Sequence, residues 1–160
     1  APQALTAGGA RLLAVGRTER RLDLARELGA EAVHSLGSGP GSEAARRFSG
    51  REGVDLVVET AGTPEAVAEA VLLARPGGRV VLTGLPHAPS TLNFFWVVRR
   101  ELRIIGSMIY RDEFPEAMKL LASGAVKVEP LVTHRFSLEA IQEAFAAHRS
   151  PESIKVAVIP

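Results

Sequence analysis

The sequence predicts an α/β fold with a parallel sheet and helices on both of its faces, a doubly wound arrangement. Short apolar runs of strand length alternate along the 160 residues with segments that carry apolar side chains at helical spacing. The predicted strands are nearly continuous apolar runs, as in residues 54–59, which is typical of strands covered on both sides. A chain of this length can bury a complete hydrophobic core.

The first half of the chain opens with a strand and a helix. Residues 11–16 form a predicted strand that ends in Gly16, and Thr18 is the expected N-cap of a helix that continues to Leu28 before Gly29 stops it. The elements expected next are a strand over residues 32–34, a surface loop over 37–42, a helix over 43–48 and a strand over 54–59.

A well-marked helix start follows residue 59. Thr63 is the expected N-cap, and Pro64 occupies the first helical position, where proline is favoured. The helix carries a stripe of apolar residues at the spacing of one buried face, namely Ala66, Val67, Ala70, Val71 and Ala74.

The second half continues the alternation. Expected here are a turn over residues 76–78, a strand over 79–83, a short helix over 93–100 and a strand over 102–107. Phe114, Ala117, Met118 and Leu121 have helical spacing, and Gly124 ends that helix. Ser137 is the expected cap of a last helix marked by Leu138, Ile141 and Phe145, and residues 154–159 form the closing strand.

Composition narrows the function classes. The formal net charge of +1 gives no bulk electrostatic reason to expect nucleic acid or an anionic membrane as a partner. The absence of cysteine excludes disulfides, zinc–thiolate sites and cysteine nucleophiles. No stretch approaches the about 20 apolar residues of a membrane span. The four dispersed histidines predict no metal site. The start has no signal-peptide pattern and the chain has no cysteine, so a cytoplasmic protein is expected.

The residues that directly follow the predicted strands are the candidate site. In parallel α/β sheets, ligands bind at the carboxyl ends of the strands. Four segments occupy such places in this sequence, at residues 16–18, 60–62, 84–86 and 107–109. We expect them to form one binding site.

Five segments of the chain resemble zinc-type medium-chain dehydrogenases, at residues 14–30, 54–62, 75–84, 129–136 and 152–156. The resemblance over residues 106–136 is strongest to the sorbitol, threonine and butanediol dehydrogenase branch. It implies a partial, Rossmann-like dinucleotide-binding domain over residues 1–150. It also implies a C-terminal strand over residues 151–160 that packs with a catalytic domain absent from this chain.

The same resemblance implies that the first strand of the domain and its glycine-rich phosphate loop are missing. No G-x-G-x-x-G occurs in the sequence, and residues 1–9 would be the remnant of the helix that follows that loop. Zinc would be held only in the absent catalytic domain, where it polarises the alcohol oxygen. The chain alone is therefore expected to be inactive.

The function that the resemblance implies is hydride transfer between NADP(H) and a secondary alcohol, polyol or ketone, so the expected partner is a small molecule. Two alternatives stay open because this domain hosts several chemistries. One is the zinc-free quinone or enoyl reductase branch of the family. The other is a non-catalytic dinucleotide-binding or dimerisation module.

The cofactor prediction depends on the end of the second family strand, where NAD-preferring members carry an acidic residue. Here Gly16 stands at that place, followed by Arg17, Thr18 and, one turn later, Arg21. Glycine leaves room for a 2′-phosphate and arginine can pair with it, which predicts NADP, with NAD as the second choice. Further cofactor-binding residues implied by the resemblance are Thr60, Ala61, Gly62, Thr83, Gly84, Leu85, Ser107, Met108 and Lys155.

The segment from Leu102 to Ile109 resembles the strand that pairs with its own copy across a two-fold axis in this family. Pairing of two edge strands hides an otherwise open sheet edge. The resemblance therefore implies a homo-oligomer that forms through this strand.

Overall fold

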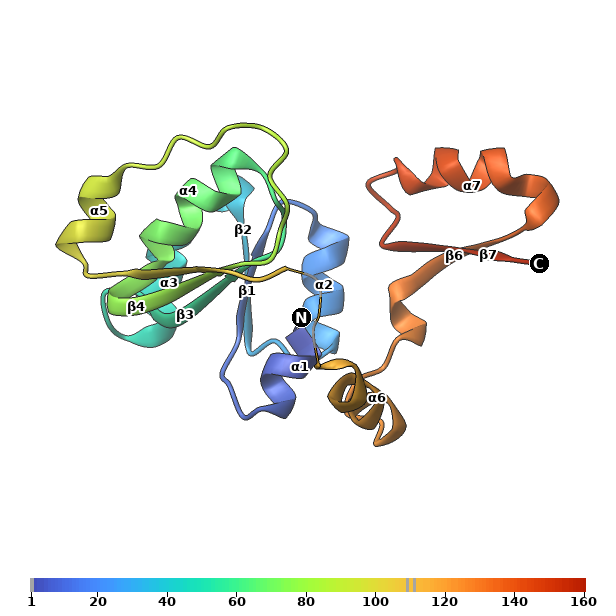
Figure 1. Cartoon of the computed structure of the whole chain (residues 1–160), viewed down its shortest axis with the longest axis horizontal. Coiled ribbons are helices and arrows are strands. Elements are labelled where there is room, and N and C mark those ends of the chain that lie inside the picture. The colour runs from blue at the N-terminus through green and yellow to red at the C-terminus, as the bar shows by residue number, and fades with distance from the viewer. Residues whose placement is uncertain (1, 109, 111) are drawn as a thin grey trace. The chain divides into compact units, whose positions relative to one another are not determined.

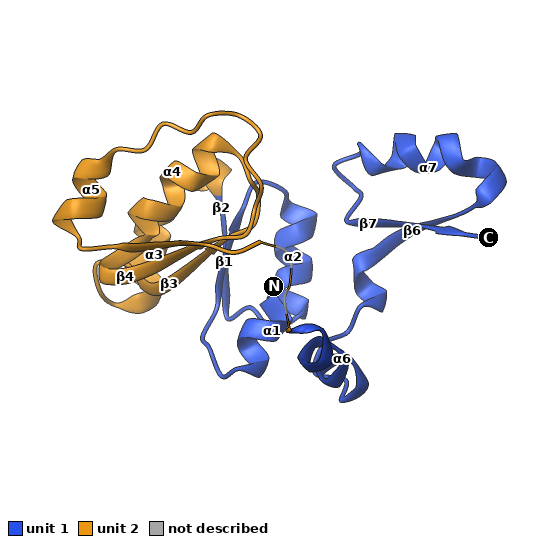
Figure 2. Ribbon diagram, in the orientation of Figure 1, with its two compact units in different colours: residues 1–35, 113–160 blue, residues 36–112 orange. Residues whose placement is uncertain are grey.

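The computed structural model describes residues 2–108, 110 and 112–160. Ile109, the last residue of the predicted pairing strand, lies outside the described residues. The chain divides into two compact units, unit 1 with residues 1–35 and 113–160 and unit 2 with residues 36–112 (Figure 2). Every strand pairing in the described part is parallel, which confirms the predicted α/β class.

Unit 2 contains a three-stranded sheet in the order β3–β4–β5 (Figure 1). Its elements are η1 (Leu36–Ser38), α3 (Gly41–Ser49), β3 (Val54–Glu59), α4 (Pro64–Leu73), β4 (Ala74–Leu82), α5 (Phe94–Arg99) and β5 (Arg103–Gly106). The register pairs Glu59 with Leu82 and Leu82 with Gly106. The three strands therefore reach their carboxyl ends at the same edge.

Helix α4 buries Val67, Ala70 and Val71 of the predicted stripe, whereas Ala66 is half-buried and Ala74, expected in the helix, is the first residue of β4. The Thr63 side chain accepts a hydrogen bond from the Ala66 amide at 3.2 Å, which confirms the predicted N-cap. Ala70, Ala74 and Val80 form the fully buried centre of the unit. The partly buried side chains packed around them are Val57, Leu82, Leu102 and Ile104.

Two boundaries in unit 2 differ from the prediction. The turn expected over residues 76–78 lies inside β4, because Val54 pairs with Ala74 and Leu56 already pairs with Arg79. The intervening residues therefore bulge out of the ladder, with Gly77 at a φ of 70°. Helix α3 begins at Gly41, inside the predicted loop, because Gly41 and Ser42 continue the glycine and serine composition of that loop.

Unit 1 contains two two-stranded parallel sheets, β1–β2 and β6–β7. Its elements are α1 (Pro2–Ala7), β1 (Leu13–Gly16), α2 (Glu19–Glu27), β2 (Ala32–Ser35), α6 (Phe114–Ala122), η2 (Glu129–Leu131), β6 (Val132–Ser137), η3 (Leu138–Ala140), α7 (Ile141–His148) and β7 (Lys155–Ile159). Helix α2 packs on β1 and β2, and α7 packs on β6 and β7. The sequence prediction contained no strand where β6 lies.

The two N-caps predicted in unit 1, Thr18 and Ser137, do not cap a helix with their side chains as Thr63 does. Thr18 is the N-cap of α2, but its side chain makes no capping hydrogen bond. Ser137 precedes the short η3 turn, so α7 itself begins only at Ile141. The described helices include none that is long and apolar enough to cross a membrane.

Candidate functional site

The carboxyl edge of the β3–β4–β5 sheet gathers the predicted residues of unit 2. Residues 60–62, 83–85 and 107–108 leave the sheet at this common edge, and the Ser107 amide donates to the Leu82 carbonyl at 2.9 Å. The structure thus brings to one edge the predicted residues Thr60, Ala61, Gly62, Thr83, Gly84, Leu85, Ser107 and Met108. Met108 and Leu85 are more than half exposed there.

Gly62 and Gly84 face each other across this edge with their main chains in close approach. Gly62 has a φ of 67°, and a Cβ on it would lie 2.7 Å from the Leu85 nitrogen. A Cβ on Gly84 would collide with the Gly62 nitrogen and lie 2.6 Å from Oε2 of Glu59. Both positions require glycine because the two loops pack against each other.

Glu59, at the end of β3, is a residue that the sequence prediction did not single out. It is 5% exposed, and it is the only charged residue in the buried class among the described residues. Its Oε1 accepts hydrogen bonds from the amides of Ala61 at 2.6 Å and Gly62 at 2.9 Å. The sequence feature that could have identified Glu59 is its position as an acidic residue at the end of a mainly apolar strand.

The main-chain carbonyl of Glu59 connects the same residue to the neighbouring loop. It accepts hydrogen bonds from the Thr83 amide at 2.9 Å, the Gly84 amide at 3.1 Å and the Thr83 hydroxyl at 2.8 Å. The side chain of Glu59 thus holds the loop after β3, and its carbonyl holds the loop after β4. One residue fixes both loops of the candidate site.

The end of β1 in unit 1 carries the residues that were predicted to select the cofactor. Gly16 is the last residue of β1, and a Cβ there would lie 3.3 Å from Cδ2 of Leu22, a flexible side chain that can yield. Arg17 is exposed, and within the described residues it makes no hydrogen bond or ion pair. The Thr18 carbonyl accepts from the amides of Arg21 and Leu22 at 3.1 Å. Because the Arg17 side chain is exposed and makes no hydrogen bond or ion pair with the described residues, it is accessible to a ligand.

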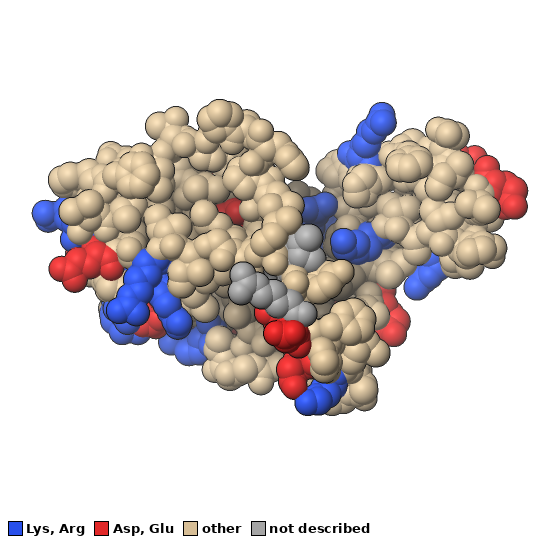
Figure 3. Space-filling model, viewed as in Figure 1, with Lys and Arg blue, Asp and Glu red and all other residues tan. Residues whose placement is uncertain are grey.

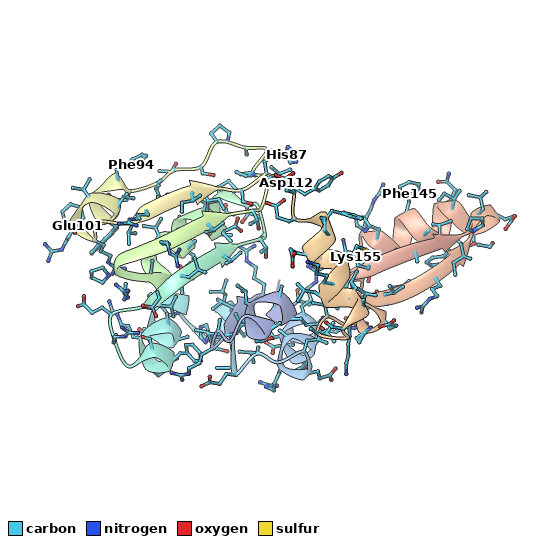
Figure 4. All side chains as sticks on the ribbon, turned by 60° about the horizontal axis from the view of Figure 1, so that its bottom comes forward. His87, Phe94, Glu101, Asp112, Phe145 and Lys155 are labelled. Atoms are coloured by element: carbon cyan, nitrogen blue, oxygen red, sulfur yellow. The ribbon has the colours of Figure 1, made fainter. Side chains whose placement is uncertain are left out.

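Arg21 and Lys155 are placed differently. The Nη2 atom of Arg21 donates to the Ser153 carbonyl at 2.8 Å, so this guanidinium already has a partner inside unit 1. Lys155 is exposed at the start of β7, and its carbonyl accepts from the Thr133 hydroxyl at 3.2 Å (Figure 4). The Lys155 ammonium carries no ion pair within the described part of the chain.

The possible metal ligands of the chain are its histidine and carboxylate side chains, since it has no cysteine. The described residues contain no group of three or more His, Asp or Glu side chains that could hold a metal ion. The His134 ring has a structural contact, with Nδ1 2.9 Å from the Thr133 hydroxyl. Zinc therefore does not fit the residues of this chain that the structure describes, whereas the loops at the carboxyl edge of the unit 2 sheet are compatible with a dinucleotide.

Both signs of charge occur on the face of unit 2 that Figure 3 shows, where acidic and basic side chains lie close together. Asp55 illustrates the mixture, since its carboxylate contacts both Arg75 and Arg51. The Arg75 hydrogen bond is the main reason that the pKa of Asp55 lies below its ordinary value.

Comparison with known proteins shows the family to which the chain belongs. The sequence matches the family of zinc-binding dehydrogenases over residues 1–123. Human sorbitol dehydrogenase is 32% identical over 151 residues, which are 93% of this chain and 42% of the human protein.

Two solved structures extend the comparison to the fold. A candidate zinc-binding dehydrogenase from Sinorhizobium meliloti 1021, bound to NADP, has a TM-score of 0.90 at 32% identity and covers 99% of this chain and 48% of its own. A short chain alcohol dehydrogenase from Escherichia coli CFT073, complexed with NADH, has a TM-score of 0.85 at 28% identity. The match covers 97% of this chain and 47% of that protein's chain. The chain spans about half the length of these proteins.

The parallel α/β units, with loops gathered at the carboxyl edge of a sheet, define a Rossmann-like domain of the kind found in dehydrogenases. The chain belongs to the zinc-binding dehydrogenase family.

Proposed function

We propose that the intact protein is an oxidoreductase that transfers a hydride between NADP(H) and a secondary alcohol, polyol or ketone. This chain contributes the coenzyme side of the site. The observation that carries the proposal is the convergence of residues 60–62, 83–85 and 107–108 at one sheet edge, in a chain that matches a dehydrogenase family. The resemblance to human sorbitol dehydrogenase supports the alcohol or polyol substrate class.

The residues of this chain bind and orient the cofactor. A bound nicotinamide dinucleotide supplies or accepts the hydride. The loop after β3 would line the ribose side of the cofactor, and the loops after β4 and β5 would face the nicotinamide carboxamide. The resemblance assigns Lys155 to the pyrophosphate. Parallel sheets place such ligands beyond the carboxyl ends of their strands, which is where these loops lie.

The preference for NADP follows from Gly16 and Arg17. A carboxylate at position 16 would repel a 2′-phosphate, whereas the exposed Arg17 guanidinium can pair with its oxygens in a bidentate manner. One similar structure is bound to NADP and another to NADH, so the similarity alone leaves both cofactors open. The charge at the end of β1 favours NADP.

Titration of the intact enzyme with NADPH and NADH tests this preference, together with the Gly16→Asp variant and Gly16→Ala as its control. The wild type should bind NADPH more tightly, and Gly16→Asp should reverse the order because the new carboxylate repels the phosphate. Gly16→Ala adds bulk near Leu22 without charge and should keep the wild-type order. Tighter NADH binding by the unmutated protein would refute the proposal.

We further propose that residues 1–150 are part of a dinucleotide-binding domain and that residues 151–160 pack with a catalytic domain outside this chain. Zinc would be held by that domain. The test is elemental analysis of the intact protein and its activity after chelation. Bound zinc with loss of turnover supports the zinc enzyme. Turnover without any metal would instead indicate the reductase branch, and no turnover with any alcohol, ketone, quinone or enoyl substrate would indicate a binding module.

We also propose that the intact protein forms at least a dimer through β5. This strand is an edge of its sheet, and Ile105 on it is 45% exposed. Helix α5 carries further exposed apolar side chains, with Phe94 on its outer side (Figure 4). Pairing of two copies would cover both features. A monomeric mass in light scattering across micromolar concentrations would contradict this proposal.

A further inference from the structure

The buried carboxylate of Glu59 has no role in the hydride transfer proposed above. Burial of a charged group is unfavourable unless the group is well hydrogen-bonded. Only half of this carboxylate meets that condition, because Oε1 accepts from two amides and Oε2 has no hydrogen-bond partner among the described residues. A residue that exists only for stability at this place would be better served by an apolar side chain.

The surroundings of the Glu59 carboxylate show what a glutamine at this position would meet. A Cβ on Gly84 would meet both Oε2 of Glu59 and the Gly62 nitrogen, so Gly84 packs directly against the carboxylate. A glutamine would turn its amide nitrogen either toward the Ala61 and Gly62 amides or toward the Oε2 position. In the first case donors face donors, and in the second a buried N–H group has no acceptor. In either orientation the glutamine amide is poorly satisfied, so this substitution should loosen the loop after β3.

We propose that Glu59 is a positioning residue for the dinucleotide, which acts through Gly62 and Gly84 on the two loops of the proposed cofactor site that follow β3 and β4. Its Oε1 fixes the loop after β3, its carbonyl fixes the loop after β4, and its Oε2 marks the wall against which Gly84 packs. Pre-organised loops lose less freedom when the ligand binds, and this increases affinity. The inference rests on the proposed function, since it assigns the residue that holds the proposed cofactor site in shape.

Glu59→Gln in the intact protein tests the inference, and Asp55→Asn is its matched control. Both change a carboxylate on β3 to its amide, but Asp55 is exposed and pairs with Arg51 and Arg75, away from the carboxyl edge. Glu59→Gln should raise the Kd for the cofactor by about tenfold, because the buried amide either opposes the Ala61 and Gly62 amides or leaves an N–H group unpaired. The KM for the cofactor should rise with it, while the KM for the alcohol stays unchanged. Asp55→Asn should leave both unchanged.

Amide hydrogen exchange without cofactor separates this inference from the proposed function. The amides of Ala61, Gly62, Thr83 and Gly84 should exchange faster in Glu59→Gln than in wild type or Asp55→Asn. Faster exchange with an unchanged Kd would overturn the positioning role and leave a structural one. A wild type that binds neither NADPH nor NADH would refute the proposed function and, with it, the positioning role, while the exchange data would still report on the loop contacts.

Gly84→Ala tests the same contact if Glu59→Gln does not fold. It leaves the carboxylate in place but pushes residues 83–85 away from Gly62, so the cofactor Kd should again rise by about tenfold. The wild type provides a measurement that needs no variant. Bound cofactor should slow amide exchange in residues 60–62 and 83–85, and unchanged exchange there would overturn the proposal.

Discussion

The guanidinium of Arg21 donates a hydrogen bond to the carbonyl of Ser153, 132 positions away in the sequence, at 2.8 Å. The preceding residue of α2 repeats the connection, since Arg20 pairs with Glu152 at 2.8 Å. Two consecutive arginines thus hold the segment that precedes β7 against α2. Arg17 makes no such contact among the described residues, so it is the arginine at the end of β1 that is accessible to a cofactor phosphate.

Arg17→Ala should weaken NADPH binding by the intact protein by roughly 10- to 100-fold, because it removes a charged pair with the 2′-phosphate. NADH binding should change by less than about twofold, since NADH lacks that phosphate. Fluorescence titration with each nucleotide measures both effects. Arg21→Ala is the comparison, and it should affect NADPH binding less because Arg21 is engaged with Ser153. Equal losses for both nucleotides in Arg17→Ala would contradict the assignment.

Thr63→Ala should destabilise the chain by about 1 kcal/mol, the usual effect of a lost N-cap bond. The Thr63 side chain accepts from the Ala66 amide, which no other side chain satisfies in the described helix start. Thr18→Ala is the matched control, because the Thr18 side chain makes no capping bond and its loss should cost less than about 0.5 kcal/mol. Urea unfolding of both variants gives the comparison, and equal losses would show that the capping bond contributes nothing.

Asp55→Asn should make the free energy of unfolding less dependent on pH. Its hydrogen bond with Arg75 lowers the pKa of Asp55 in the folded chain. The stabilisation is therefore fully present above the unfolded pKa of about 3.9 and is lost as the pH falls through the lower folded pKa. The carboxylate is exposed, so the difference at neutral pH should stay below about 1 kcal/mol. Unfolding curves at pH 7 and in acid measure it, and a wild-type advantage that grows in acid would contradict the sign.

Arg100→Ala should destabilise unit 2 by about 2 kcal/mol, since charged hydrogen bonds to part-buried carbonyls are lost. Its Nη1 atom donates to the carbonyls of Leu72 at 3.0 Å and Ala74 at 3.1 Å, at the end of α4. The same guanidinium lies 5.0 Å from the Trp96 ring centroid. Arg99→Ala, at an exposed neighbouring position, should cost less than about 0.5 kcal/mol. Thermal unfolding of the two variants distinguishes them, and similar midpoints would contradict the capping role of Arg100.

The part of the candidate site that consists of residues directly following the strands could be predicted from the sequence. Residues 60–62, 83–85 and 107–108 follow apolar runs in the sequence, and parallel topology brings such segments to one edge. Glu59 was missed because its importance comes from contacts across two loops. The bulge in β4 was missed for a similar reason, since proline and glycine at residues 76–78 indicate a turn whether or not the ladder resumes after it.

The sequence by itself determined the α/β alternation, the helix stripe of α4 and the segments that leave the strands, because these depend on periodicity and on local turn chemistry. It also carried the glycine and arginine pair at the end of β1. Only the tertiary structure decided which arginine is occupied, why Gly62 and Gly84 must be glycine, and that Glu59 holds both loops. These are contacts between residues far apart in the chain or on neighbouring strands, and a local pattern does not contain them.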